Sequence, residues 1–167
     1  MYHAHSKNNG GFWETVSAHL RETATLSARF ASAWDREEEG AATGLLHDLG
    51  KYTDLFKLVL EGKAQQVDHA TPGAHALLRL YKKEGVAAAL AAQGHHDGLQ
   101  IGRTKDLGEA LRMKEPVSAQ NKTYSSRDVD TLLEHFRQDN LKLPPQIKSD
   151  YFMEYKDNRQ VAAMLYV

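Results

Sequence analysis

A histidine followed directly by an aspartate, His47-Asp48, is the pair of residues in this sequence best suited to chemistry. The surrounding residues 45–51 read Leu-Leu-His-Asp-Leu-Gly-Lys, and their apolar members predict burial. Burying an imidazole or a carboxylate without a partner is costly, so the pair needs a metal ion, hydrogen bonds or solvent. Lys51 follows His47 by four positions and is expected on the same side of a helix. A surface pair that ends a helix at Gly50 is the alternative interpretation.

The same stretch nearly matches a phosphate-binding loop, because Gly44 precedes Gly50-Lys51. Such a loop has four residues between its glycines and a Ser or Thr after its lysine. Here five residues separate the glycines, and Tyr52 follows the lysine. No strand is predicted before the segment, although such a loop should follow one. We therefore reject this interpretation, and with it a helicase motor within this chain.

Further histidines stand where helices are expected to begin, end or face inward. His19 falls on the inward side of the first expected helix, His69 precedes a helix start, and His95-His96 follow a helix end. Taken singly, each is more often a structural histidine held by hydrogen bonds than a ligand of a metal ion. Together with His47-Asp48 they form an ordered series of side chains that can bind a metal ion.

The composition limits the chemistry that these residues can perform. The chain has 167 residues, of which nine are histidine and none is cysteine. Disulfides, cysteine zinc sites and thiol nucleophiles are therefore excluded, and a metal ion would be held by His, Asp, Glu or backbone oxygen. With 21 basic and 22 acidic residues the net charge is −1, which argues against a protein that coats nucleic acid. The longest apolar stretch, residues 86–92, is too short for a bilayer and no export signal is evident, so we expect a cytoplasmic protein without membrane contact.

Helices are expected to position these side chains, because apolar residues recur every three or four positions along most of the chain. This pattern predicts an all-α fold. Thr71 is expected to cap one helix and Gly94 to stop another. Residues 101–125 are polar and weakly periodic, and we interpret them as a long loop or insertion with one helical piece near residues 107–113. The expected helices cover residues 12–34, 37–51, 52–60, 71–85, 86–93, 126–136 and 150–167.

The ordered series resembles the HD superfamily of metal-dependent phosphohydrolases, which is named for its adjacent His-Asp pair. More narrowly, it resembles the HD nuclease domain of the type I CRISPR helicase–nuclease. The resemblance is good over residues 1–100 and diffuse over residues 101–150. Four stretches carry the narrower resemblance: Phe-Trp-Glu-Thr-Val-Ser-Ala-His-Leu at 12–20, Gly-Leu-Leu-His-Asp-Leu-Gly-Lys at 44–51 with Phe56, Val-Asp-His-Ala-Thr-Pro-Gly-Ala at 67–74, and Gly-His-His-Asp-Gly-Leu at 94–99.

The resemblance implies a helical bundle with a metal site between its helices. Asp48 would bridge two ions, and Lys51 would lie near the phosphate and neutralise charge in the transition state. Up to two divalent ions are expected as cofactors, drawn from Mn, Ni, Co, Fe or Mg, and imidazole ligands suit the transition metals better than Mg. Two such ions can activate water and stabilise a phosphodiester transition state. The implied metal ligands are His19, His47, Asp48, His69, His95 and His96.

The end of the sequence departs from the family pattern. HD proteins supply one more metal-binding aspartate from a late helix, and residues 159–167 resemble the start of that helix. The sequence stops before such an aspartate, while Asp150 and Asp157 stand too early in the pattern. We therefore expect residues 1–167 to form a single HD domain that is truncated in its last helix.

The resemblance implies a nuclease that cleaves single-stranded DNA in type I CRISPR interference, which is an antiviral defence. Its partners would be a helicase domain, in cis or in trans, and an RNA-guided surveillance complex. Two alternatives stay open: an HD phosphohydrolase of nucleotides or cyclic nucleotides, and a domain that only docks on a partner. Of the other histidines, His75 is expected in the core or on the surface, and His3, His5 and His135 are expected to be structural or solvated. His3 and His5 would approach the site if the N-terminus folds back.

Overall fold

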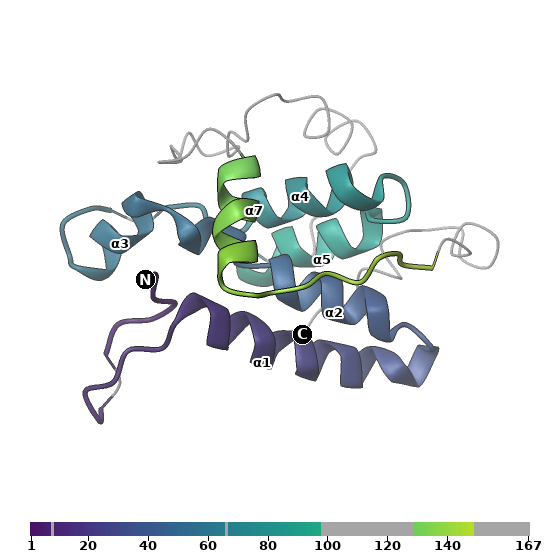
Figure 1. Cartoon of the computed structure of the whole chain (residues 1–167), viewed down its shortest axis with the longest axis horizontal. Coiled ribbons are helices and arrows are strands. Elements are labelled where there is room, and N and C mark those ends of the chain that lie inside the picture. The colour runs from purple at the N-terminus through teal and green to yellow at the C-terminus, as the bar shows by residue number, and fades with distance from the viewer. Residues whose placement is uncertain (8, 66, 98–128, 149–167) are drawn as a thin grey trace.

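The computed structural model describes residues 1–7, 9–65, 67–97 and 129–148, and these are mainly helical (Figure 1). Over this part of the chain no strand forms, and an isolated bridge joins His3 to Thr15. The predicted all-α fold is confirmed. The helices are α1 (Val16–Ala31), η1 (Ser32–Trp34), α2 (Glu37–Leu46), η2 (Leu49–Tyr52), α3 (Asp54–Leu60), α4 (Thr71–Tyr81), α5 (Val86–Asp97) and α7 (Val129–Gln138), where η denotes a 3₁₀ helix.

Helices α1 and α2 pack against each other and form the lower layer of the fold (Figure 1). Thr15 caps α1, because its hydroxyl accepts a hydrogen bond from the N–H of Ala18 at 3.2 Å. Asp35 then takes a left-handed backbone conformation, with φ of 54°, and α2 returns antiparallel to α1. The face of α1 that packs on α2 repeats at helical spacing and consists of Val16, Leu20, Ala24, Ser27 and Ala31.

Helices α4 and α5 form a second pair that lies on α2, and α7 crosses in front of this pair (Figure 1). Residues 87–92 of α5 are buried and mostly alanine, which lets the neighbouring helices approach closely. A hydrogen bond connects η2 to the end of α7. The hydroxyl of Tyr52, the last residue of η2, donates to Oδ2 of Asp139, which directly follows α7, at 2.7 Å. The large apolar side chains of the shared core include Leu46, Leu49, Leu77, Leu132 and Phe136.

The helix predicted over residues 37–51 is wrong in its last part, because α2 ends at Leu46. His47 and Asp48 form a turn, and the tighter helix η2 follows. The backbone N–H of Gly50 donates to the carbonyl of His69 at 3.1 Å rather than to a carbonyl of α2. A bond between distant parts of the chain thus replaces a local helical bond, and it turns Asp48 out of the helix.

The helix stop predicted at Gly94 is also wrong. Helix α5 continues through Gly94 to Asp97, so His95 and His96 lie in its last turn. A glycine inside a helix costs only about 1 kcal/mol relative to alanine. The burial of the alanines in residues 87–92 outweighs that cost, so the helix continues.

One predicted helix start and one predicted helix cap also differ from the structure. Helix α1 begins at Val16 rather than at residue 12, because the preceding residues pair with the N-terminal segment. Helix α4 does begin near Thr71, but the carboxylate of Asp68 caps it. Asp68 Oδ1 accepts from the N–H groups of Ala70 at 3.1 Å and Thr71 at 3.0 Å. The N-cap position is therefore Ala70, one residue earlier than the sequence pattern predicts, and Asp68 supplies the side-chain acceptor in place of Thr71.

Several predictions fall on residues that lie outside the described part of the chain. These are the loop or insertion at 101–125, the helix start at 126, and the truncated last helix at 150–167. Helix α7 lies within the described part of the chain. The apolar face predicted for this helix is buried, and it consists of Val129, Leu132, Leu133 and Phe136. Among the helices that the structure describes, none combines the length and the apolar character needed to cross a bilayer.

Candidate metal centre

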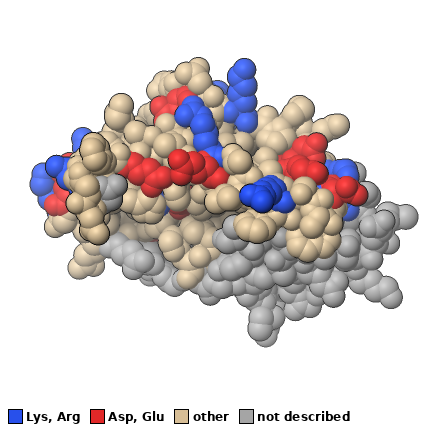
Figure 2. Space-filling model, turned by 90° about the horizontal axis from the view of Figure 1, so that it is seen from below, with Lys and Arg blue, Asp and Glu red and all other residues tan. Residues whose placement is uncertain are grey.

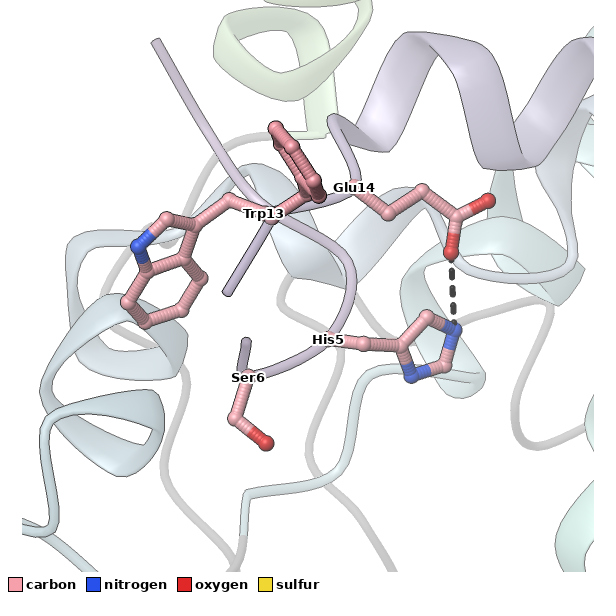
Figure 3. Close-up of a pocket in the computed structure, with 5 residues that line it drawn as sticks. His5, Ser6, Trp13 and Glu14 are labelled. Atoms are coloured by element: carbon pink, nitrogen blue, oxygen red, sulfur yellow. Dashed lines mark ion pairs between the residues drawn. The ribbon is translucent and has the colours of Figure 1, made fainter. Parts of the chain in front are cut away.

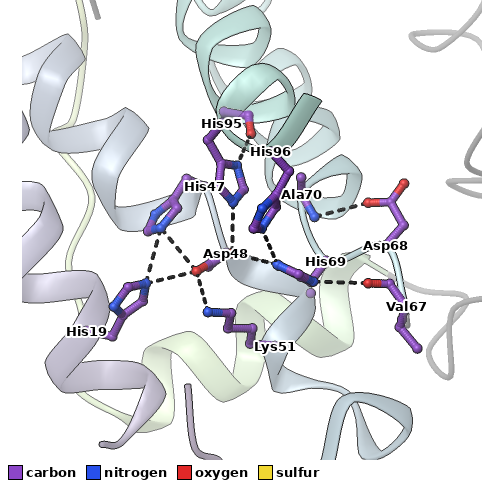
Figure 4. A network of polar contacts seen from close by, with 12 residues as sticks. His19, His47, Asp48, Lys51, Val67, Asp68, His69, Ala70, His95 and His96 are labelled. Carbon is purple, nitrogen blue, oxygen red and sulfur yellow. Dashed lines mark hydrogen bonds and ion pairs between the residues drawn. The ribbon is translucent and has the colours of Figure 1, made fainter. Parts of the chain in front are cut away.

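The carboxylate of Asp48 is the centre of a cluster of histidines (Figure 4). Asp48 is 2% exposed and lies in the turn that follows α2. The cluster draws its side chains from segments that are far apart in the sequence. They are His19 from α1, His47 from the same turn, Lys51 from η2, His69 from the segment before α4, and His95 and His96 from the last turn of α5.

One oxygen of this carboxylate faces α1 and its own turn. Asp48 Oδ2 lies 2.8 Å from His19 Nε2, 3.1 Å from His47 Nε2 and 2.8 Å from Lys51 Nζ. The two imidazoles also approach each other, with 3.2 Å between their Nε2 atoms. The early end of α2 brings Lys51 onto Asp48, where it is 5% exposed. Its ammonium group therefore neutralises this buried carboxylate.

The other oxygen faces α5 and the segment before α4. Asp48 Oδ1 lies 3.2 Å from His95 Nε2 and 3.4 Å from His69 Nε2. The Nε2 atom of His96 lies 2.6 Å from that of His69, at the exposed side of the cluster. The cluster is therefore two groups of histidines that share one carboxylate.

Backbone carbonyls fix the tautomer of three of these histidines. A carbonyl only accepts hydrogen bonds, so each Nδ1 must carry the proton, and each Nε2 of a neutral ring is left with a bare lone pair. These lone pairs point toward Asp48. The bonds run from His47 Nδ1 to Gly44 O (2.8 Å), from His69 Nδ1 to Val67 O (3.0 Å) and from His95 Nδ1 to Ala92 O (2.6 Å).

This arrangement fits a divalent metal ion. Asp48 Oδ1 and His95 Nε2 are both shielded from solvent, and neither has a hydrogen-bond partner among the described residues. Lone pairs of imidazole nitrogens and carboxylate oxygens that converge in this way need a cation between them. The donor set suits a transition-metal ion. One candidate position uses His19, His47 and Asp48, and a second uses Asp48, His69, His95 and His96.

The electrostatics of the cluster keep Asp48 and His69 in the protonation states that metals require, and act in the opposite direction at His95. Burial raises the pKa of Asp48, but its contacts with His19, His47 and His95 outweigh burial and hold that pKa well below its usual value. Burial lowers the pKa of His69 to about 4, so that its ring is neutral at pH 7. For His95, burial lowers the pKa, but the contact with Asp48 prevails and the net shift is upward. Metal binding would therefore compete with protons at His95.

Close backbone packing holds His69 in place. A Cβ atom on Gly50 would lie 2.6 Å from the Cα of His69, so only glycine lets η2 approach this segment. The ring of Phe56 packs on the ring of His69, with centroids 5.1 Å apart. Asp68 caps α4 directly beside it. The sequence resemblance singled out these flanking residues, and the structure gives them this positioning role.

Two residues outside the predicted ligand set lie near the cluster: His5, which was expected to approach if the N-terminus folds back, and Glu14, which was not expected. The N-terminus folds back, since Ala4 N–H donates to the carbonyl of Glu14 at 2.9 Å. This pairing brings His5 Nε2 to 3.5 Å from Glu14 Oε2, and Glu14 Oε1 lies 3.9 Å from His19 Nδ1. The ligand atoms of these three residues lie within 4.8 Å of one another. Of the two, Glu14 had no distinguishing signal in the sequence beyond its place just before the α1 cap.

Two other histidines have structural contacts. His135 Nδ1 donates to the carbonyl of Tyr52 at 3.3 Å. The ring of His3 packs against that of Trp13, with centroids 4.9 Å apart. These contacts agree with the structural roles expected for both.

A helical fold that gathers histidines around one buried carboxylate defines a candidate metal-binding protein. The HD domain family matches residues 16–143, a span that includes all seven predicted site residues. This chain belongs to the HD domain family, whose members are typically metal-dependent hydrolases. A comparison with the curated proteins found no match.

Proposed function

We propose that this protein is a metal-dependent phosphodiesterase that cleaves single-stranded DNA, as the nuclease of type I CRISPR interference. The observation that supports hydrolysis best is the division of one carboxylate between two histidine groups. Each oxygen of Asp48 faces a separate set of imidazole nitrogens. Divalent ions, when bound, supply Lewis-acid activation of water and neutralise charge on a phosphate.

The roles of the individual side chains follow from their positions. His19 and His47 would hold an ion at one oxygen of Asp48, and His69, His95 and His96 would hold an ion at the other. Lys51 neutralises Asp48, and it would lie near the phosphate of a bound substrate, where its charge would stabilise the transition state. The exposed side of the cluster at His96 gives a substrate access from solvent.

The choice of single-stranded DNA rests on the sequence stretches that flank these residues. All four stretches that resemble the CRISPR nuclease contribute a side chain to the cluster. On the face of the molecule seen in Figure 2, basic and acidic side chains are interspersed, and the described residues form no continuous basic surface there. DNA would therefore be held locally and with help from partners, namely a helicase domain, in cis or in trans, and an RNA-guided surveillance complex.

The test is a cleavage assay with the purified chain, Mn²⁺ or Ni²⁺, and four substrates: single-stranded DNA, duplex DNA, mononucleotides and cyclic nucleotides. We expect cleavage of single-stranded DNA alone, and its loss in Asp48→Asn and His47→Ala. His135→Ala is the matched control, because it removes a histidine that lies outside the cluster, and it should retain activity. Release of phosphate from mononucleotides without DNA cleavage would instead select a nucleotide phosphohydrolase. Metal binding without hydrolysis of any substrate would refute the proposal and favour a docking role.

A further inference from the structure

A pocket opens beside the metal centre, between the N-terminal segment and the residues that lead into α1 (Figure 3). Its volume is about 500 Å³. Trp13 lies on one side of it, and His5 and Glu14 lie on the other. The lining residues are His5, Ser6, Phe12, Trp13 and Glu14.

The pocket exposes aromatic surface to solvent. Phe12 is 74% exposed and Trp13 is 37% exposed, although both are large and apolar. The ring of His3 packs against Trp13 and limits the orientations of its indole. Two polar residues, Ser6 and Glu14, complete the lining. A planar aromatic ligand with a polar edge matches this combination.

A single imidazole ring separates the pocket from the metal centre. Glu14 Oε1 lies 3.9 Å from His19 Nδ1, while Nε2 of the same ring lies 2.8 Å from Asp48 Oδ2. The rings of His5 and His19 also meet edge to face, with centroids 4.9 Å apart. A ligand in this pocket would therefore be a near neighbour of a group bound at Asp48.

We propose that this pocket binds a nucleobase of the substrate, stacked on Trp13 and Phe12 with its polar edge toward Ser6 and Glu14. The phosphate attached to that nucleotide then lies at the metal centre. Every base has a π-face, and aromatic stacking therefore holds single-stranded nucleic acid without selecting its sequence. The link between base and cleaved phosphate rests on the proposed function, whereas base binding itself does not.

Binding is measured first on metal-free protein, so that it does not depend on hydrolysis. The chain has two tryptophans, and Trp34→Phe leaves Trp13 as the only one. A single-stranded oligodeoxynucleotide should quench the fluorescence of Trp13 saturably, whereas an abasic oligomer of the same length should not. Trp13→Ala and Phe12→Ala should each weaken binding of the base-bearing oligomer by about 5- to 150-fold, as measured by fluorescence anisotropy.

Three controls separate stacking from other effects. Trp34→Ala removes a tryptophan that is 45% exposed and follows the far end of α1, and it should leave the affinity unchanged. Trp13→Phe keeps an aromatic face and should bind nearly as the unaltered protein does. Circular dichroism should show the same helix content in all variants.

The possible outcomes distinguish the pocket from the enzyme. Equal effects of Trp13→Ala on base-bearing and abasic oligomers, or no effect on either, would overturn the pocket even if metal-dependent cleavage is observed. Saturable quenching together with the loss in Trp13→Ala would support the pocket even if no substrate is hydrolysed. If the protein binds bases in this way but hydrolyses no substrate, only the proposed function fails.

Discussion

Replacing Gly73 by alanine is expected to destabilise the protein and to weaken metal binding, although Gly73 lies inside a helix where alanine is normally preferred. Gly73 is in the first turn of α4, against the end of α2. An added Cβ would lie 2.8 Å from the carbonyl carbon of Leu46 and closer still to its oxygen, whereas ordinary contacts are 3.4–4 Å. The two helices would have to separate where His47 begins.

The magnitude follows from two opposing effects. Alanine gains about 1 kcal/mol over glycine from helix propensity. Overpacking of a rigid core costs about 1–3 kcal/mol and occasionally more, and here the clash is with backbone that cannot rotate away. We therefore expect the free energy of unfolding to fall by up to about 2 kcal/mol. A shift between α4 and α2 also displaces His69 relative to Asp48, so metal affinity should fall by roughly 10- to 100-fold.

Urea denaturation and isothermal titration with Mn²⁺ measure the two effects. Thr25→Ala is the matched control, because Thr25 is exposed on α1 and alanine there brings helix propensity without a clash. It should leave the metal affinity unchanged. The reasoning would be refuted if Gly73→Ala stabilised the protein by about 1 kcal/mol, as propensity alone predicts, with metal affinity intact.

Three further predictions concern residues around the centre. Lys51→Met leaves the buried carboxylate of Asp48 without its ammonium partner, so metal-free protein should lose about 3 kcal/mol in urea denaturation, and added Mn²⁺ should restore much of the loss. Asp68→Ala removes the cap of α4 and should lower the free energy of unfolding by about 1 kcal/mol, and a fall below 0.3 kcal/mol would contradict the capping role. Burial and the bond to Asp139 raise the pKa of Tyr52, so the stability that the neutral phenol contributes is complete below about pH 10 and is lost as the pH rises further. Unfolding followed from pH 8 to 11 should show a smaller alkaline loss in Tyr52→Phe than in the unaltered protein, and equal losses would contradict the assignment.

The helical class and the types of side chain that could bind a metal ion were predictable from the amino-acid sequence alone. The apolar spacing of Val129, Leu132, Leu133 and Phe136 predicted the buried face of α7, because such a face depends only on residues within a few turns. The ordered histidines and Asp48 were found for a similar reason. Their chemistry belongs to the side chains, and buried imidazole and carboxylate groups need partners wherever they lie.

How these groups meet depends on contacts between segments that are far apart in the sequence. Whether α2 continued past Leu46 depended on a hydrogen bond from Gly50 to His69, which no local pattern encodes. Whether α5 continued past Gly94 depended on the burial of its alanines, which outweighed the cost of the glycine. The C-terminal ends of α2 and α5 together set the directions of the imidazoles of His47, His95 and His96.

Which residues surround the metal centre also depends on contacts between distant segments of the chain. Glu14 comes near His19 through the pairing of Ala4 with Glu14, and the sequence pattern contains no trace of that pairing. Side-chain type and helical period are properties of neighbouring residues, so a single sequence displays them. The sharing of Asp48 between two groups of histidines depends on packing between helices, and that packing is fixed only when the whole chain folds.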